Sequence, residues 1–309
     1  MNLFAPAVKE RLKARVAIDG PTGSGKTYTA LTWARILAGP DGVVGVIDTE
    51  NRSAAYYAPS PGQKIERMQF WDAPFEFGHM PWEPPYDPVK LARTIEAAAT
   101  EIGEGGVLVI DSLSHFWTGE GGTLDVVDNA SGRAGNSFAG WKVGTPVQRN
   151  LIDTIVHARC HVIVTMRSKM EWVIEQVERN GKTINMPRKL GLAPEQRQGI
   201  EYEFTVVCDM DLEHRLAVTK SRCDVIADVV AQPSRAHEPA QTFAKWLDSG
   251  VTRLDENKVG ELTAMIDSVD DEDKRRSLKI EFVKEWGKPA ELLSDEFEQA
   301  REWVESHLK

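Results

Sequence analysis

The chain is poor in cysteine, has no excess of basic residues and lacks any long hydrophobic run. Its three cysteines, Cys160, Cys208 and Cys223, are too few and too scattered for a disulfide framework, and no Cys-x-x-Cys pair offers a zinc site. The 37 Lys and Arg residues against 47 Asp and Glu residues give a net charge of −10, which argues against a histone-like nucleic-acid coat. No uninterrupted apolar stretch reaches the roughly 18 residues of a membrane span, and the N-terminus has no signal-peptide pattern. We therefore expect a cytoplasmic protein of a reducing compartment.

Short apolar runs alternate with helical patterns through the first two-thirds of the chain. Four such runs, each bounded by turn residues, lie at 16–18, 43–47, 107–110 and 161–165. Continuous apolar runs of this length are typical of parallel strands that helices cover on both faces. The helix candidates between them lie at 25–38, 87–102 and 146–158. The pattern predicts an α/β fold with a mostly parallel central sheet flanked by helices.

The pattern changes twice after residue 200. Residues 202–207 and 216–219 indicate neighbouring, antiparallel strands, and proline and polar residues then interrupt the pattern. Beyond residue 250, apolar side chains recur at helical spacing on short amphipathic segments. We predict a core over 1–230, a linker over 231–250 and a small helical C-terminal domain over 251–309.

A phosphate-binding loop follows the first apolar run. The sequence matches the pattern G-x-x-x-x-G-K-[ST], and it lies between an expected strand and an expected helix, as the chemistry requires. Backbone N–H groups of such a loop surround phosphate oxygens, Lys26 reaches the terminal phosphates, and Thr27 presents its hydroxyl to Mg²⁺. The predicted cofactors are thus ATP and Mg²⁺. The predicted nucleotide-binding residues are Gly20, Pro21, Thr22, Gly23, Ser24, Gly25, Lys26, Thr27 and Tyr28.

Two acidic residues end neighbouring apolar runs at the same edge of the expected sheet. Asp111 follows the run 107–110, where a carboxylate can hold the water shell of Mg²⁺ together with Thr27. Glu50 follows the run 43–47, where it can orient and deprotonate an attacking water. The alternative for Glu50 is a solvated loop carboxylate.

These motifs together resemble the RecA-like ATPases, most closely the short phage-type members grouped with Sak-type single-strand annealing proteins and archaeal RadA. Besides the phosphate loop and the strand end at Asp111-Ser112, the matching pieces are the segments 48–50, 164–169, 199–204 and 219–222. The resemblance covers roughly residues 8–230. For a phage-encoded member it places the protein in the cytoplasm of the host cell.

The resemblance implies roles for particular residues. Lys26 and Thr27 would bind phosphate and metal, Glu50 would activate water, and Asp111 would complete the metal site. Nucleotide would sit between protomers of a filament or ring, with Lys220 and Arg222 reaching the neighbour's site. An exposed Lys and Arg at a strand end is the alternative.

The sequence also departs from the family in one place and offers one further match. Arg167 stands where RecA has an Asn-Gln pair, which makes it a candidate phosphate sensor. Phe4-Ala5-Pro6-Ala7 fits the F-x-x-A pattern with which RadA-like subunits dock.

Only one stretch of this acidic chain is basic. Residues 131–190 carry 10 basic and 4 acidic side chains, and they contain both segments with which RecA-like cores meet DNA. The first is a Gly-rich loop after the Asp111 strand. The second reads as a β-hairpin that turns at Asn180-Gly181, with Trp172 as a stacking surface for an unpaired base. The predicted DNA-binding residues are Arg133, Lys142, Lys169, Trp172, Arg179, Lys182, Arg188 and Lys189.

The sequence thus favours an ATP-dependent phage-type recombinase with DNA-stimulated ATPase activity, which binds single-stranded DNA and promotes annealing or strand pairing. A ring-forming helicase or packaging motor and a nucleotide-dependent regulatory protein without DNA binding stay open as alternatives. The expected partners are single-stranded DNA, further copies of the chain and, through the C-terminal helices, a single-strand-binding or other recombination protein. No membrane partner is expected.

Overall fold

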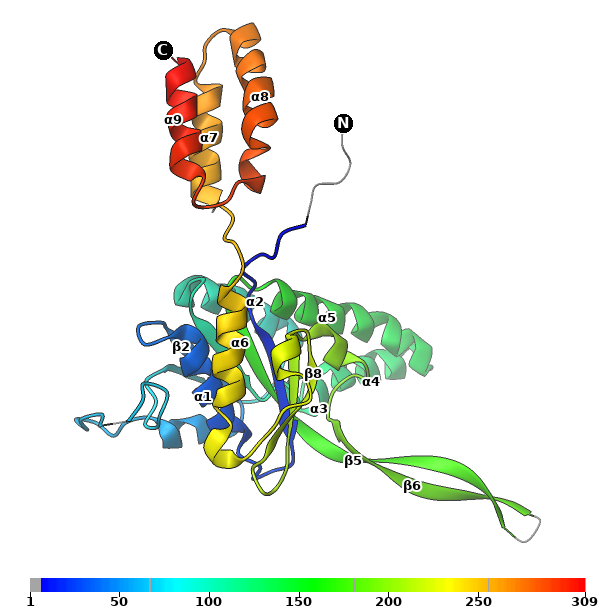
Figure 1. Ribbon diagram of the computed structural model, residues 1–309. Coiled ribbons are helices and arrows are strands. Elements are labelled where there is room, and N and C mark those ends of the chain that lie inside the picture. The colour runs from blue at the N-terminus through cyan, green and yellow to red at the C-terminus, as the bar shows by residue number, and fades with distance from the viewer. Residues whose placement is uncertain (1–6, 67, 180–181, 255, 309) are drawn as a thin grey trace. The chain divides into compact units, whose positions relative to one another are not determined.

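The computed structural model describes residues 7–66, 68–179, 182–254 and 256–308, without the side chains of 170–192 and 256 (Figure 1). It divides into two compact units, residues 13–245 and residues 1–12 with 246–309. No described helix has the length and apolar character needed to cross a bilayer.

The larger unit is built on a mostly parallel sheet. Its order is β3-β2-β4-β5-β1-β7-β8-β9, with β6 paired to β5 outside this path. The first five strands of that order and β7 run parallel, whereas β6, β8 and β9 are antiparallel to their neighbours. The strands are β1 (Arg15–Gly20), β2 (Val44–Asp48), β3 (Gly78–Pro81), β4 (Val107–Asp111), β5 (His161–Arg179), β6 (Lys182–Pro194), β7 (Val206–Met210), β8 (Leu216–Ser221) and β9 (Val230–Ala231).

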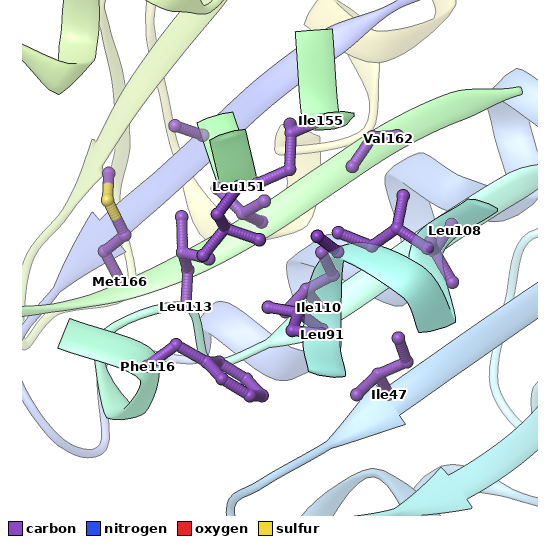
Figure 2. Packing of buried hydrophobic residues seen from close by; sticks show 14 of the residues in the cluster. Ile47, Leu91, Leu108, Ile110, Leu113, Phe116, Leu151, Ile155, Val162 and Met166 are labelled. Atoms are coloured by element: carbon purple, nitrogen blue, oxygen red, sulfur yellow. The ribbon is translucent and has the colours of Figure 1, made fainter. Parts of the chain in front are cut away.

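Helices cover both faces of this sheet, which confirms the predicted fold class. Residues of α2 (Pro88–Ile102) and α5 (Ser137–His157) pack with alternate strand residues into one core, in which Leu91, Ile110 and Leu151 lie close together (Figure 2). The other face is covered by α1 (Lys26–Ala38), with α6 (Glu238–Asp248) beside it (Figure 1). The Trp33 indole of α1 donates to the Ala236 carbonyl just before α6 at 2.9 Å.

The expected Gly-rich DNA loop after Asp111 is instead helical, which corrects that prediction. The short α3 (His115–Thr118) leads into α4 (Thr123–Ala134), which forms a hairpin with α5. Glycine serves close packing here, since Cβ atoms at Gly140 and Gly144 would overlap the Val127 side of α4. The predicted helix 146–158 is only the second half of α5, and Pro146 lies within the helix.

This close packing predicts that Gly140→Ala destabilises the protein. The added methyl would overlap Ser131 Oγ and the Val127 carbonyl, and overpacking of this kind costs about 1–3 kcal/mol. Thermal unfolding should show a midpoint lowered by roughly 3–8 °C. Gly132→Ala on the same hairpin is the control, because its Cβ meets nothing within 4 Å and should leave or raise the midpoint. Equal midpoints for the two variants would contradict the packing argument.

The segment 231–250, expected as a linker, is largely structured. It contains the end of β9, the 3-10 turn η4 (Pro233–Arg235) and the whole of α6. Two further 3-10 turns, η2 (Ile200–Glu203) and η3 (Asp224–Ile226), flank the β7–β8 pair, so the strand expected at 202–207 begins only at Val206. The antiparallel pairing expected there is present between β7 and β8.

The smaller unit has its own core among three helices. These are α7 (Glu256–Asp267), α8 (Glu272–Trp286) and α9 (Phe297–Leu308), with the 3-10 turn η5 (Pro289–Glu291) before α9. Their apolar faces meet in a cluster that includes Leu262, Phe282 and Val304. Residues 7–12 also belong to this unit, where Glu10 pairs with Arg253 at 2.7 Å.

Candidate functional site: a P-loop nucleotide site

The phosphate loop joins the end of β1 to the start of α1. A Cβ at Gly20 would lie 2.5 Å from the Met210 carbonyl, so only glycine fits this close approach of β7. Gly25, with φ 91°, occupies the N-cap position of α1 and offers no side chain to the first turn. The free N–H groups of that turn are the donors that a phosphate requires.

The loop contains one buried hydroxyl that fits a phosphate. Ser24 is fully buried, and its Oγ has no hydrogen-bond partner among the described residues. Lys26 Nζ donates to the carbonyls of Gly20 at 2.9 Å and Pro21 at 2.8 Å, so the ammonium lies over the loop. Burial lowers the pKa of Lys26, although Asp111 and Glu50 oppose the shift. A bound polyphosphate would satisfy both groups.

Asp111 receives hydrogen bonds from two threonines. Thr27 Oγ1 donates to one carboxylate oxygen at 2.6 Å, and Thr165 Oγ1 donates to the other at 2.5 Å. Burial raises the pKa of Asp111, while these two donors counter the shift. A hydroxyl beside a carboxylate is an oxygen donor set that suits Mg²⁺. The pair therefore fits the predicted metal role of Thr27 and Asp111.

The turn after β2 holds Glu50 in place. The Asp48 carboxylate accepts the N–H groups of Glu50 at 2.8 Å and Ala54 at 3.0 Å, and it contacts His79 Nε2 at 3.0 Å. The Thr49 N–H donates to the Asp111 carbonyl at 2.6 Å. The backbone that carries Glu50 is thus hydrogen-bonded to the strand that carries Asp111, the carboxylate predicted to bind metal.

Glu50 and Arg167 form a bidentate ion pair. Arg167 Nε lies 2.8 Å from one carboxylate oxygen and a terminal nitrogen lies 2.6 Å from the other. Burial by itself would raise the pKa of Glu50, but the hydrogen bonds and charge of Arg167 outweigh it and lower that pKa. The same hydrogen bonds raise the pKa of Arg167. Glu50 is therefore an ionised carboxylate at neutral pH.

Five of the nine predicted nucleotide-binding residues line one cavity. It has a volume of about 340 Å³ and is lined by Thr22, Gly23, Gly25, Lys26, Thr27, Glu50, Ser53, Tyr57, Asp111, Arg167 and His214. A second cavity of about 430 Å³ shares Gly25, Tyr57 and His214 with it. Aromatic rings line this second cavity. The ring centroids of Tyr28 and Tyr57 lie 5.5 Å apart, and those of Trp71 and His237 lie 6.0 Å apart. The two adjoining volumes suit a phosphate chain and a base.

Sequence comparison identifies the family of this site. Residues 12–245 match the family AAA_24, described as an AAA domain. The chain belongs to this family. The AAA domain is accordingly a P-loop ATPase, and its phosphate loop implies the binding of ATP and Mg²⁺. A bound Mg²⁺ would neutralise charge on the phosphates, held by Thr27 and Asp111.

Other comparisons add little to this assignment. The crystal structure of the KaiC-like protein PH0186 from the hyperthermophilic archaeon Pyrococcus horikoshii OT3 is 14% identical and matches 72% of this chain and 93% of that chain, with a TM-score of 0.37. The fold of the AAA domain follows from its own strand order. No curated protein sequence matches the chain.

The predicted cations Lys220 and Arg222 lie outside the AAA-domain cavity. Lys220 Nζ donates to the carbonyls of Glu201, Tyr202 and Phe204 at 2.6–2.9 Å. Because β8 runs antiparallel, its end pairs with the start of β7, far along the sheet from Gly20. Arg222 is exposed there. Their role in a neighbouring protomer stays a prediction.

The predicted DNA residues fall into two groups. Arg133 and Lys142 lie on the α4–α5 hairpin and Lys169 lies on β5, in the described part of the AAA domain. Strands β5 and β6 form the predicted hairpin, whose ribbon extends away from the sheet (Figure 1). The turn residues Asn180 and Gly181, with Phe4, Ala5 and Pro6 of the docking motif, lie outside the described residues. The side chains of Trp172, Arg179, Lys182, Arg188 and Lys189 also lie outside them.

Sequence reasoning missed several groups of the AAA domain's site. Tyr57 ends the 3-10 turn η1 (Ser53–Tyr57), Trp71 and His237 lie in segments that lack any motif, and His214 lies in the turn between β7 and β8. The cluster of aromatic residues over 56–77 is the only sequence signal that could have indicated a base pocket.

A buried carboxyl beside the phosphate loop makes stability depend on pH. Asp19 of β1 is 6% exposed and is the register partner of Asp209 on β7. Burial, followed by the charge and hydrogen bond of Asp209, raises the pKa of Asp19 from 3.8 to about 7. A raised folded-state pKa contributes stability that is complete below pH 4 and is lost as the pH rises through about 7.

We therefore expect Asp19→Asn to stabilise the AAA domain at pH 8 and to change little at pH 4. The gain at pH 8 should be on the order of 2–4 kcal/mol, because the buried charge is removed. Thermal unfolding at both pH values measures it, with the exposed Asp41→Asn as control. A gain that is equal at the two pH values would contradict the assignment of the raised pKa.

Proposed function

We propose that this protein is an ATP-dependent RecA-like ATPase that assembles on single-stranded DNA and promotes annealing or strand pairing. The observation that carries the proposal is the position of Arg167. The side chain of Arg167 pairs with Glu50 in the nucleotide cavity. The backbone of Arg167 lies at the point of β5 where pairing with β1 ends and pairing with β6, in the hairpin, begins. One strand thus links the ATPase site with the basic segment expected to meet DNA.

Contacts at the base of the hairpin support this link. The Arg167 N–H donates to Ser114 Oγ at 2.9 Å, and the Glu195 N–H, just after β6, donates to the Arg167 carbonyl at 2.6 Å. Gln196 then joins a buried chain of hydrogen bonds through Gln148 to Thr123 at the start of α4. A movement of the β5–β6 hairpin or of the α4–α5 hairpin would therefore act on residues that surround the nucleotide.

The residues of the site suit hydrolysis of ATP by direct attack of a water molecule on the terminal phosphate. ATP would place its phosphates on the loop, with Lys26 and the N-terminus of α1 stabilising their charge. Arg167 would turn from Glu50 to the terminal phosphate, since a polyphosphate competes for a guanidinium. Glu50 could then accept a proton from a water that attacks the phosphorus, as the bond to the departing ADP oxygen breaks.

A salt titration of single-strand binding tests the proposal. In the presence of ATP, the affinity for a fluorescent oligonucleotide should fall steeply with salt, by a log–log slope of about 0.7 for each phosphate neutralised. Lys182→Glu and Trp172→Ala should weaken binding, whereas Lys64→Glu, an exposed lysine outside the basic segment, should not. Binding that is absent or independent of salt would overturn the proposal. Strand unwinding by the same protein would favour a motor instead.

A further inference from the structure

We propose that His115 is a positioning residue for Glu50, acting through the hydroxyl of Thr49. The inference rests on the proposed ATPase function and deepens it, because it names a group that the reaction needs but that does not contact nucleotide. His115 is not one of the residues that line the nucleotide cavity.

The Thr49 hydroxyl lies between Ser112, which follows Asp111, and the ring of His115. Thr49 is 2% exposed, and its Oγ1 accepts the Ser112 N–H at 2.8 Å. The same oxygen lies 2.7 Å from His115 Nδ1 and 3.3 Å from the Ser112 carbonyl. We assign the hydroxyl hydrogen to Nδ1, which lies nearer than the Ser112 carbonyl, so that the neutral imidazole accepts it. One hydroxyl therefore fixes the residue before Glu50 to the residue after Asp111.

The imidazole is itself held in one orientation. Its ring stacks on Tyr86, with centroids 4.7 Å apart and 17° between the planes. Tyr86 packs in turn on Phe116 of the main core. A ring held on one face and bonded at one nitrogen restricts the Thr49 hydroxyl to a single direction.

Charged residues of three other segments act on His115. Arg167 of β5, Glu50 after β2 and Glu195 after β6 act on its charge, and Tyr86 covers one face. Burial, then Arg167, lowers the pKa of His115, while the two glutamates oppose the shift. Protonation below its ordinary pKa would place a hydrogen on Nδ1 and force the Thr49 hydroxyl toward the Ser112 carbonyl. At acidic pH, that change would therefore release Glu50 from its position.

The effect should appear in turnover rather than in substrate binding. His115→Ala should lower kcat for ATP about 10-fold or more, since a misplaced general base loses rate steeply, and should leave KM within about threefold. Thr49→Val should lower kcat by a similar factor. The double variant should be no slower than Thr49→Val alone, because Thr49→Val already breaks the hydrogen bond to His115 along with the one from the Ser112 N–H.

Conservative replacement separates positioning from folding. His115→Asn keeps a polar atom near the place of Nδ1 and does not titrate, so it should restore kcat to within about threefold of the unaltered protein and flatten the acid limb of its pH profile. His157→Ala is the matched control, because His157 lies at the end of α5 and bonds its own helix at the Asp153 carbonyl, away from the cavity. Thermal unfolding of all variants checks that they fold.

The outcomes are distinct. Unchanged kcat in His115→Ala, or equal losses in His115→Ala and His115→Asn, would overturn the positioning role while leaving the ATPase function intact. Additive losses in the double variant would overturn the route through Thr49. Absence of hydrolysis by the unaltered protein would contradict the proposed function itself, and the inference with it.

Discussion

Replacing Glu50 with Gln should reduce kcat for ATP hydrolysis by about 100-fold or more while ATP still binds. The amide keeps the shape of the side chain but cannot accept a proton, and a positioned general base contributes about 10²–10⁴ in rate. ATP binding should persist because Lys26 and the loop amides supply the phosphate contacts. Steady-state hydrolysis and titration with a fluorescent ATP analogue measure the two quantities separately.

The control for this experiment is Glu96→Gln, an equal change at an exposed position of α2. It should hydrolyse ATP at the rate of the unaltered protein. The pair with Arg167 adds a further check, since Glu50→Gln removes one charge of a bidentate ion pair and should lower the pKa of Arg167. Unaltered turnover in Glu50→Gln would show that Glu50 does not activate the water.

Lys26→Ala should abolish ATP binding at concentrations that saturate the unaltered protein. Lys26 is the cation of the loop, and each charge-assisted hydrogen bond to a phosphate is worth about 1.5–3 kcal/mol, so loss of two such bonds weakens affinity by about 100-fold or more. Thermal unfolding with and without ATP provides the measurement, because a ligand that no longer binds no longer raises the midpoint.

Lys64→Ala is the matched control, since Lys64 is exposed in a loop outside the cavity. Its unfolding midpoint should still rise with ATP. An equal rise in Lys26→Ala would mean that nucleotide binds elsewhere, and it would separate the phosphate loop from the function assigned to it.

Local sequence signals predicted four of the parallel strands correctly. The four apolar runs are β1, β2, β4 and the sheet-forming part of β5, because a short, continuous apolar run suits a strand that is buried on both faces. The helix expected at 87–102 begins at Pro88, where the Asp87 side chain accepts the N–H groups of Val89 and Lys90 as an N-cap does. The edge strand β3 was missed because Gly78–Pro81 has no apolar alternation.

Elements whose structure depends on distant contacts were not predicted. The Gly-rich stretch after Asp111 looked like a loop because glycine is costly in a helix, but Gly140 and Gly144 let α4 and α5 approach closely. Tertiary packing outweighed local propensity there.

The site was predictable where a motif fixes local geometry. The loop from Gly20 to Thr27 is such a case, and the edge of a parallel sheet brings Asp111 and Glu50 beside it. The pairing of Glu50 with Arg167, 117 residues later in the chain, required the order of the strands. The Thr49–His115 bond required even finer geometry, which no sequence pattern encodes.

We propose that strand β5 couples ATP hydrolysis to the binding of single-stranded DNA. The most direct measurement is the steady-state rate of ATP hydrolysis by the unaltered protein with and without a single-stranded oligonucleotide, at low salt. We expect measurable hydrolysis that rises several-fold with single-stranded DNA and returns to its basal rate at high salt, with Lys182→Glu showing only the basal rate. Hydrolysis that is the same with and without DNA, in a protein that binds ATP, would contradict the account.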